Sequence, residues 1–268
     1  MFCTTALDPL FTALDTPAFT DRHLANLAAG TVAAVRIPDF LDPTTCHAAM
    51  TALDRLPTAD YDPARVPTRI VRFGPALNDY RSGPDGALDA DRYWRDAEAA
   101  RTAWQRAGMR PDPTGISLAR LGSAWGAAVA PATIDGQPVF GGTLREINAG
   151  ALIHYDDLNR EYPDGLFDQD VVAQLAFNVW VSVPETGGAT TVWRHRWEPA
   201  DEPHRQAYGY QHRTVEDCQK VTLAPRLGDG LLFNPTNFHA VEPSPTGRRI
   251  AFAFFLGLTT MGQLIAWS

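Results

Sequence analysis

The feature that most constrains the fold is a series of short β-type segments in the second half of the chain. From about residue 143 the segments TLREINA, ALIHYDD, VVAQLAFNVWVSV, TTVWRHRW, DGLLFNP and RRIAFAFFLGL are rich in apolar and β-branched residues. Turn-forming stretches such as PETGGA and PTG lie between them. Many short strands with closely spaced turns are typical of a β-sandwich or barrel. The pattern predicts a mainly β fold with a core over about 143–258.

The N-terminal region carries helical patterns that we expect to buttress one face of this core. Between Leu24 and Leu56 the pattern is helix, strand, helix, with the β-branched strand at Thr31–Ile37. Asp42 and Pro43 have the character of an N-cap and a first-turn proline at the start of the second helix.

The stretch 57–113 is irregular and rich in Asp, Pro, Gly and Arg. A short strand is expected at Arg69–Phe73 and a helix at Asp91–Ala107. Long irregular segments of compact domains often form lids or binding segments. No linker divides the sequence, so we expect residues 1–268 to form a single domain.

Charge and composition exclude several classes of function. The 268 residues carry a net charge of −8, and clustered basic residues are what phosphate backbones select, so no nucleic-acid partner is expected. No stretch approaches the ~18 apolar residues of a membrane span, and the N-terminus lacks the pattern of a signal peptide. Cys3, Cys46 and Cys218 are widely spaced, which predicts reduced thiols rather than disulfides or a thiolate metal site. These features predict a cytoplasmic protein with no membrane partner.

A candidate metal site is formed by His154, Asp156 and His239. Side chains alternate along a strand, so a His and a carboxylate two residues apart can point to the same side. His239 follows the strand-like GDGLLFNP and offers a third ligand. Two His and one carboxylate form the facial triad of non-haem iron oxygenases. His-x-Asp alone is a common pattern, and a lone His near a strand end is usually structural. The surrounding residues therefore decide whether these three form a metal site.

Two arginines open the last apolar segment of the predicted core. Arg248 and Arg249 follow Gly247 and precede IAFAFFLG. An arginine at the mouth of an apolar strand is costly to bury without an anion, and a guanidinium binds a carboxylate through two hydrogen bonds. A dicarboxylate such as 2-oxoglutarate would supply that anion. For Arg248, an exposed position in a turn is supported as well as a role in binding this anion. For Arg249, the anion-binding role is the better supported of the two.

From Gly150 to Leu256 the chain resembles the 2-oxoglutarate/Fe(II)-dependent dioxygenase superfamily, particularly its prolyl-hydroxylase-like branch. The resembling pieces occur in order: GALIHYDD, LAFNVWVSVPETGGATTVW and LAPRLGDGLLFNPTNFHAVEPSPTGRRIAFAFF, with RIPDFLDPTTCHAAMTALD upstream. The 2-oxoglutarate-binding basic residue of this branch falls two residues after a Gly and ten after the distal His, and both counts lead to Arg249. Residues 57–142 match least.

The resemblance implies a double-stranded β-helix of the jelly-roll or cupin-like type. It also implies an enzyme that uses Fe(II), 2-oxoglutarate and O₂, with His154, Asp156 and His239 as metal ligands. Arg249 would hold the cosubstrate, and we assign Arg248 and Asn178 to the same cosubstrate site. Family members that halogenate replace the metal-binding carboxylate with a small residue. Because Asp156 is present, hydroxylation is favoured over halogenation, although desaturation and cyclisation use the same triad.

The expected substrate is a small molecule, with a free amino acid or a natural-product intermediate as the main candidates. HYDD is faintly similar to the motif region of hydroxylases and halogenases of free amino acids. Asp157 and Arg72 could bind an amine and a carboxylate, but a turn or supporting role for Asp157 is equally compatible. The alternatives are a hydroxylase of peptide or protein residues, with 57–113 as a groove, and a non-catalytic cupin-like protein that binds a metal or ligand.

Overall fold

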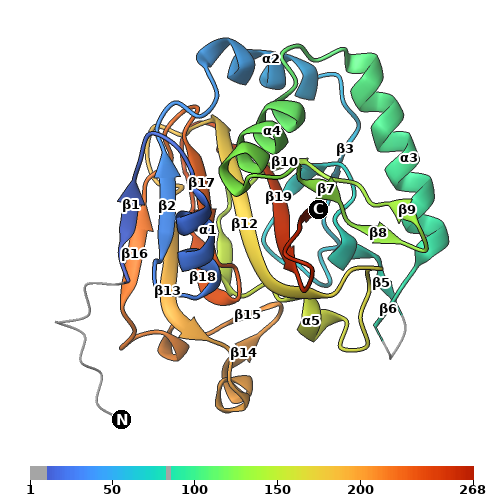
Figure 1. The fold of residues 1–268 in the computed structure, drawn as a ribbon. Coiled ribbons are helices and arrows are strands. Elements are labelled where there is room, and N and C mark those ends of the chain that lie inside the picture. Colours follow the sequence, from blue (N-terminus) through green and yellow to red (C-terminus); the bar gives the residue numbers. More distant parts are fainter. Residues whose placement is uncertain (1–10, 83–85) are drawn as a thin grey trace.

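The computed structural model describes residues 11–82 and 86–268, and two β-sheets that face each other dominate it (Figure 1). The larger sheet has the order β1-β2-β17-β12-β19-β10-β4-β3, and β20 pairs with both β19 and β7. Its strands are β1 (Ala13–Asp15), β2 (Ala34–Ile37), β3 (Thr58–Asp60), β4 (Val71–Phe73), β7 (Ala130–Pro131), β10 (Thr143–Glu146), β12 (Val171–Ser182), β17 (Gly230–Phe233), β19 (Ile250–Thr259) and β20 (Leu264–Trp267).

The smaller sheet has the order β14-β15-β11-β18-β13-β16. Its strands are β11 (Ala151–His154), β13 (Thr190–Arg196), β14 (Arg205–Gln206), β15 (Gly209–Tyr210), β16 (Lys220–Leu223) and β18 (Asn237–Val241). Two small hairpins, β5 (Arg81–Ser82) with β6 (Ala87–Leu88) and β8 (Thr133–Ile134) with β9 (Gln137–Pro138), lie outside both sheets. The predicted jelly-roll core is confirmed.

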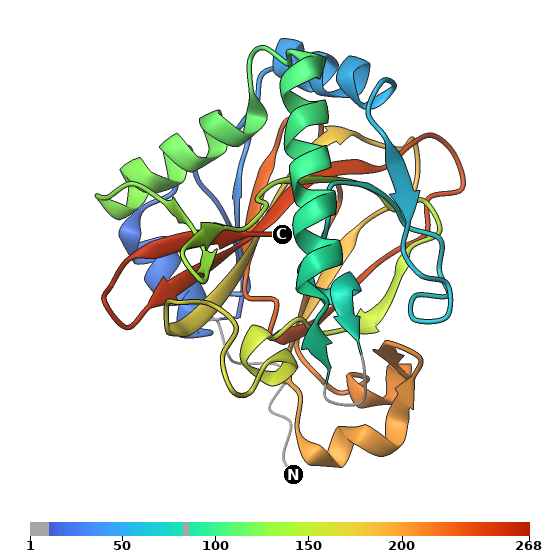
Figure 2. The same ribbon diagram turned by 90° about the vertical axis from the view of Figure 1, so that its right-hand side faces the viewer.

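Helices cover the outer face of the larger sheet, as predicted (Figures 1 and 2). They are α1 (Asp21–Ala28), α2 (Pro43–Leu53), α3 (Ala90–Ala107) and α4 (Pro113–Trp125), and the short α5 (Leu158–Glu161) follows β11. Both α1 and α2 pack against β12. Asp42 accepts a hydrogen bond from the Thr45 backbone N–H at 2.9 Å, so it is the N-cap of α2 that the sequence predicted.

The alternation of side chains in β12 shows why this strand is almost continuously apolar. Phe177 and Val179 belong to the core between the sheet and the helices. Ala176 and Trp180 belong to a second core, between the two sheets. A strand that is buried on both faces needs apolar residues on both, and the long β19 has the same character.

The sequence did not predict three features of this fold. Helix α4 was not expected, although Asp112 accepts hydrogen bonds from its first turn and Pro113 begins it. Strand β18, which carries His239, was not predicted as a strand. The strand expected through residues 151–157 ends at His154, because Asp157 instead becomes the N-cap of α5.

Within residues 11–82 and 86–268, no helix has the length and apolar character needed to cross a membrane. Cys46 is a buried free thiol, and burial raises its pKa to about 11. Cys3 and the first ten residues, on which part of the expectation about thiols and targeting rested, lie outside the described residues.

Candidate active site

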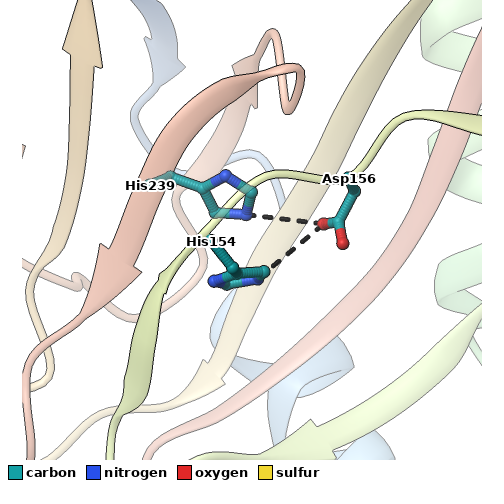
Figure 3. Close-up of side chains that lie close together, drawn as sticks. All are labelled: His154, Asp156 and His239. Carbon is teal, nitrogen blue, oxygen red and sulfur yellow. Dashed lines mark ion pairs between the residues drawn. The ribbon is translucent and has the colours of Figure 1, made fainter. Parts of the chain in front are cut away.

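Three predicted side chains meet where β11 and β18 pair. His154 is the last residue of β11, and it lies directly opposite His239 of β18 in the antiparallel register. Asp156 follows two residues later, and its backbone N–H donates to the Pro235 carbonyl at 2.9 Å. Figure 3 shows the imidazole rings and the carboxylate turned toward one another.

The distances among these groups suit a single metal ion. Asp156 Oδ2 lies 3.4 Å from His239 Nε2 and 3.9 Å from His154 Nε2. One ligand atom from each residue lies within 4.8 Å of the others, and no second cluster of this kind occurs among the residues that the structure describes. Nitrogen and carboxylate oxygen donors converging from one side leave the opposite side open, as in the facial triad of non-haem iron sites.

Backbone carbonyls orient both imidazoles for metal binding. His154 Nδ1 lies 2.7 Å from the Leu152 carbonyl, and His239 Nδ1 lies 3.0 Å from the Asn237 carbonyl. A carbonyl can only accept a hydrogen bond, so each Nδ1 carries the proton. Each Nε2 then presents its lone pair, and metal-binding histidines are commonly fixed in this way.

The pKa values of two of these groups favour the protonation states that a metal requires. Burial, together with the charge of His239, lowers the pKa of His154 to about 4. Burial alone would raise the pKa of Asp156, but the neighbouring His239 and His154 lower it to about 2. Near neutral pH, His154 is therefore neutral and Asp156 is ionised, which are their ligating forms. The residues thus fit a divalent metal ion.

Arg249 is a buried cation that has no counter-ion in the part of the chain that the structure describes. Its side chain is only 3 % exposed, and it forms no ion pair with any carboxylate of the described residues. Its Nε donates to the Gly188 carbonyl at 2.8 Å, and one terminal nitrogen donates to Thr190 Oγ1 at 3.1 Å. Burial lowers its pKa to about 10, so the guanidinium stays charged at neutral pH. A buried charge of this kind is costly unless an anion joins it.

A cavity of about 660 Å³ joins the metal-ligand cluster to Arg249. Thr190 and Asn178 also line it. The segment 57–113 contributes part of the wall, through the residues Tyr61, Ala64, Arg65, Val66, Ile70, Asn78, Asp79 and Arg81. This region was expected to form a lid or binding segment, and it does border the cavity.

Three residues of the sequence interpretation lie elsewhere. The Arg248 guanidinium binds Glu146 at 2.7 Å and does not line the cavity, because it is on the outward side of the turn before β19. Arg72 donates to the Gly74 carbonyl and pairs with the Asp79 carboxylate, so its charge is already compensated. Asp157 caps α5 by accepting from the Asn159 backbone N–H at 3.1 Å.

The cavity also contains charged residues that the sequence reasoning missed. Arg145 of β10 and Glu161 of α5 both line it, and so does Tyr208, whose ring contacts the His154 ring with 5.4 Å between centroids. The clue to Arg145 was a charged residue inside an apolar strand segment, TLREINA. Glu161 ends the short helix α5 and Tyr208 lies in a turn, and neither segment carries a comparable pattern.

Comparisons with known proteins agree with this fold and site. The sequence model of a family described as carrier-protein-independent halogenase WelO5 matches residues 120–267. L-gamma-glutamyl-L-propargylglycine hydroxylase of Streptantibioticus cattleyicolor is 55% identical over 259 residues, 96% of each chain. An N-substituted L-amino acid dioxygenase from Burkholderia ambifaria has the same fold, with a TM-score of 0.64, 17% identity, and coverage of 93% of this chain and 92% of the other. A structure of that dioxygenase in complex with alpha-ketoglutarate gives a TM-score of 0.59, with 18% identity and coverage of 92% of this chain and 91% of the other.

Fold, metal-ligand cluster and relatives together define the class of protein. The chain belongs to the iron(II)- and 2-oxoglutarate-dependent oxygenases, in the family described as carrier-protein-independent halogenases. It is a dioxygenase that depends on Fe(II), 2-oxoglutarate and O₂. The interpretation as a non-catalytic cupin-like protein is therefore not supported. Unlike the halogenating members, this chain keeps a carboxylate, Asp156, within the cluster.

Proposed function

We propose that this enzyme hydroxylates a C–H bond of a small amino-acid derivative, with a γ-glutamyl amino acid as the leading substrate class. The observation that supports this most is the His154, Asp156 and His239 cluster, which faces a cavity that also contains the uncompensated Arg249. The substrate class rests on the 55% identical relative, which is named for a γ-glutamyl amino acid.

The proposal gives each residue of the site a role. His154, Asp156 and His239 hold Fe(II), through both Nε2 atoms and a carboxylate oxygen. Bound there, iron and 2-oxoglutarate supply the oxidising chemistry, in which O₂ converts R–H and 2-oxoglutarate into R–OH, succinate and CO₂. Arg249 binds a carboxylate of 2-oxoglutarate through the N–H groups that do not contact Gly188 and Thr190. Asn178, which lines the same cavity, contributes to this cosubstrate site.

The apolar wall of the cavity orients the substrate and excludes water. Phe233, Phe254 and Phe255 line it together with Ala176 and Ala253. Small residues leave room beside the metal-ligand cluster, and aromatic residues limit the access of solvent. The lining also contains charged and polar residues, so the cavity suits a small molecule that carries both apolar and charged groups.

The test combines cosubstrate binding with turnover. Anaerobic protein with Fe(II) and 2-oxoglutarate should develop a visible charge-transfer band that His154→Ala abolishes. In air, the protein should convert L-gamma-glutamyl-L-propargylglycine into a product heavier by one oxygen atom, with one succinate formed per product. A band without any such product would retain the cosubstrate site but reject the substrate class, and free amino acids and peptides would then be compared. The absence of the band in the wild-type protein would reject the assigned ligands.

The proposal includes a cytoplasmic location, which rests on the widely spaced cysteines of the sequence. Cell fractionation would check it.

A further inference from the structure

Arg145 is another cation of the cavity that has no counter-ion among the described residues. It lies in β10, opposite Ala251 of β19, and it lines the cavity. Its Nε is buried without a hydrogen-bond partner, and no ion pair joins it to a carboxylate of the described residues. Arg145 is only half-buried, so its terminal nitrogens can reach a ligand anion, and such an anion would offset the cost of the unpartnered Nε.

Arg145 and Arg249 occupy different parts of the cavity. The Arg145 guanidinium lies over the Phe255 ring, 5.9 Å from its centroid. The backbones of the two arginines are close, because Ala251, opposite Arg145, is two residues beyond Arg249, so the two side chains differ in the direction they take. The Arg249 guanidinium instead binds Gly188 and Thr190. The proposed function assigns Arg249 to 2-oxoglutarate, which leaves Arg145 for an anionic group of the substrate.

Glu161 supplies the opposite charge beside Arg145. Both residues line the cavity and also a small recess beside it, which Asp156, Asp157 and Phe255 border as well. Glu161 forms no ion pair with any described cation. Burial, and then the charge of Asp156, raises the pKa of Glu161 to about 7, while Arg81 and Arg65 act in the opposite direction. A bound cation would stabilise its ionised form.

The other arginines nearest this recess already have partners or a more exposed position. Arg160 pairs with Asp157 at 3.7 Å. Arg205 pairs with Glu202. Arg65 lies on the exposed part of the cavity wall. Arg81 donates to the Gly86 carbonyl and lies over the Tyr162 ring. Arg145, whose Nε has no hydrogen-bond partner, is therefore the cation that we take as available beside Glu161 and the metal-ligand cluster.

We propose that Arg145 and Glu161 bind the α-carboxylate and the α-ammonium of a free amino-acid head group on the substrate. A carboxylate and an ammonium on one carbon atom match a guanidinium and a carboxylate that line one recess. The inference rests on the proposed function and makes it more specific, because a γ-glutamyl amino acid carries such a head group on its glutamyl unit. It transfers the role first considered for Arg72 and Asp157 to two residues that do line the cavity.

Three matched probes separate the two charges. L-gamma-glutamyl-L-propargylglycine carries both groups, its glutaryl analogue lacks the ammonium, and its 4-aminobutyryl analogue lacks the carboxylate. Binding of each would be measured by anaerobic calorimetry on protein with Fe(II) and 2-oxoglutarate. The variants are Arg145→Gln and Glu161→Gln. Their matched controls are Arg106→Gln and Glu98→Gln, which remove the same charges from exposed positions of α3.

Wild-type protein should bind each analogue at least about tenfold more weakly than the full probe, because a charged partner in a partly buried site is lost. Arg145→Gln should bind the full probe about tenfold more weakly than wild-type protein does. This variant should bind the full probe and the 4-aminobutyryl analogue with equal affinity. Glu161→Gln should likewise lose discrimination against the glutaryl analogue, and the controls should behave as wild type.

Two results would overturn the inference: wild-type protein that binds no probe, or variants that keep full discrimination. The charge-transfer band measured on the same samples reports separately on the metal and cosubstrate site. A normal band with unchanged discrimination rejects the head-group assignment alone. An absent band rejects the proposed metal and cosubstrate ligands, while calorimetry without added metal still tests Arg145 and Glu161.

Discussion

Replacing Arg249 with Gln should weaken 2-oxoglutarate binding strongly while leaving the fold intact. A guanidinium has five N–H donors, and two of those of Arg249 bind Gly188 and Thr190. The remaining three suffice for two parallel hydrogen bonds to a carboxylate. Removing one partner of a buried, hydrogen-bonded charge pair costs about 2–5 kcal/mol, which corresponds to a dissociation constant roughly 30- to 5,000-fold higher.

The assay is an anaerobic titration of the Fe(II)-loaded protein with 2-oxoglutarate, followed through the charge-transfer band. Arg248→Gln is the matched control, because it removes the same charge from the adjacent residue. The structure pairs Arg248 with Glu146 and leaves its side chain 44% exposed, so this variant should change the affinity less than about threefold. Equal weakening in both variants, with unchanged unfolding temperatures, would refute the assignment of the cosubstrate to Arg249 alone.

Two further predictions concern residues that the sequence did not reveal. Tyr208→Phe should lower Fe(II) affinity several-fold. The Tyr208 hydroxyl accepts a hydrogen bond from the Leu152 backbone N–H at 2.8 Å, and the carbonyl of the same residue orients His154. Unchanged affinity in a metal titration would show that the Tyr208–Leu152 hydrogen bond is not needed for metal binding. The raised pKa of Glu161 means that the folded protein retains a proton that the unfolded chain loses above about pH 4.5, so stability should fall as the pH rises from about 4.5 to about 7. Glu161→Gln should remove this loss of stability. In thermal unfolding of the metal-free proteins, the unfolding temperature of the variant should rise relative to that of the wild type as the pH increases from about 4.5 to about 7. A constant difference between the two unfolding temperatures would contradict the raised pKa.

The sequence by itself determined the fold class and the members of the metal-ligand cluster. The β-type segments and their turns predicted the jelly-roll because strand periodicity and turn chemistry are local properties, legible along the chain. His154, Asp156 and His239 were found by spacing and order, and Arg249 by its offset from Gly247 and His239. Helix α2 was predicted through its cap, which is also a local signal.

The tertiary structure decided what depends on neighbours distant in the chain. Arg248 and Arg249 are adjacent, but alternation at the start of β19 turns one toward Glu146 and the other into the cavity. Arg72 and Asp157 were plausible substrate ligands until the fold placed Asp79 beside one and the first turn of α5 beside the other. Arg145 and Glu161 are separated in the chain and line one cavity only in the folded protein. Which charges are neutralised, and which remain for a ligand, depends on burial and partners, and these exist only once the chain has folded.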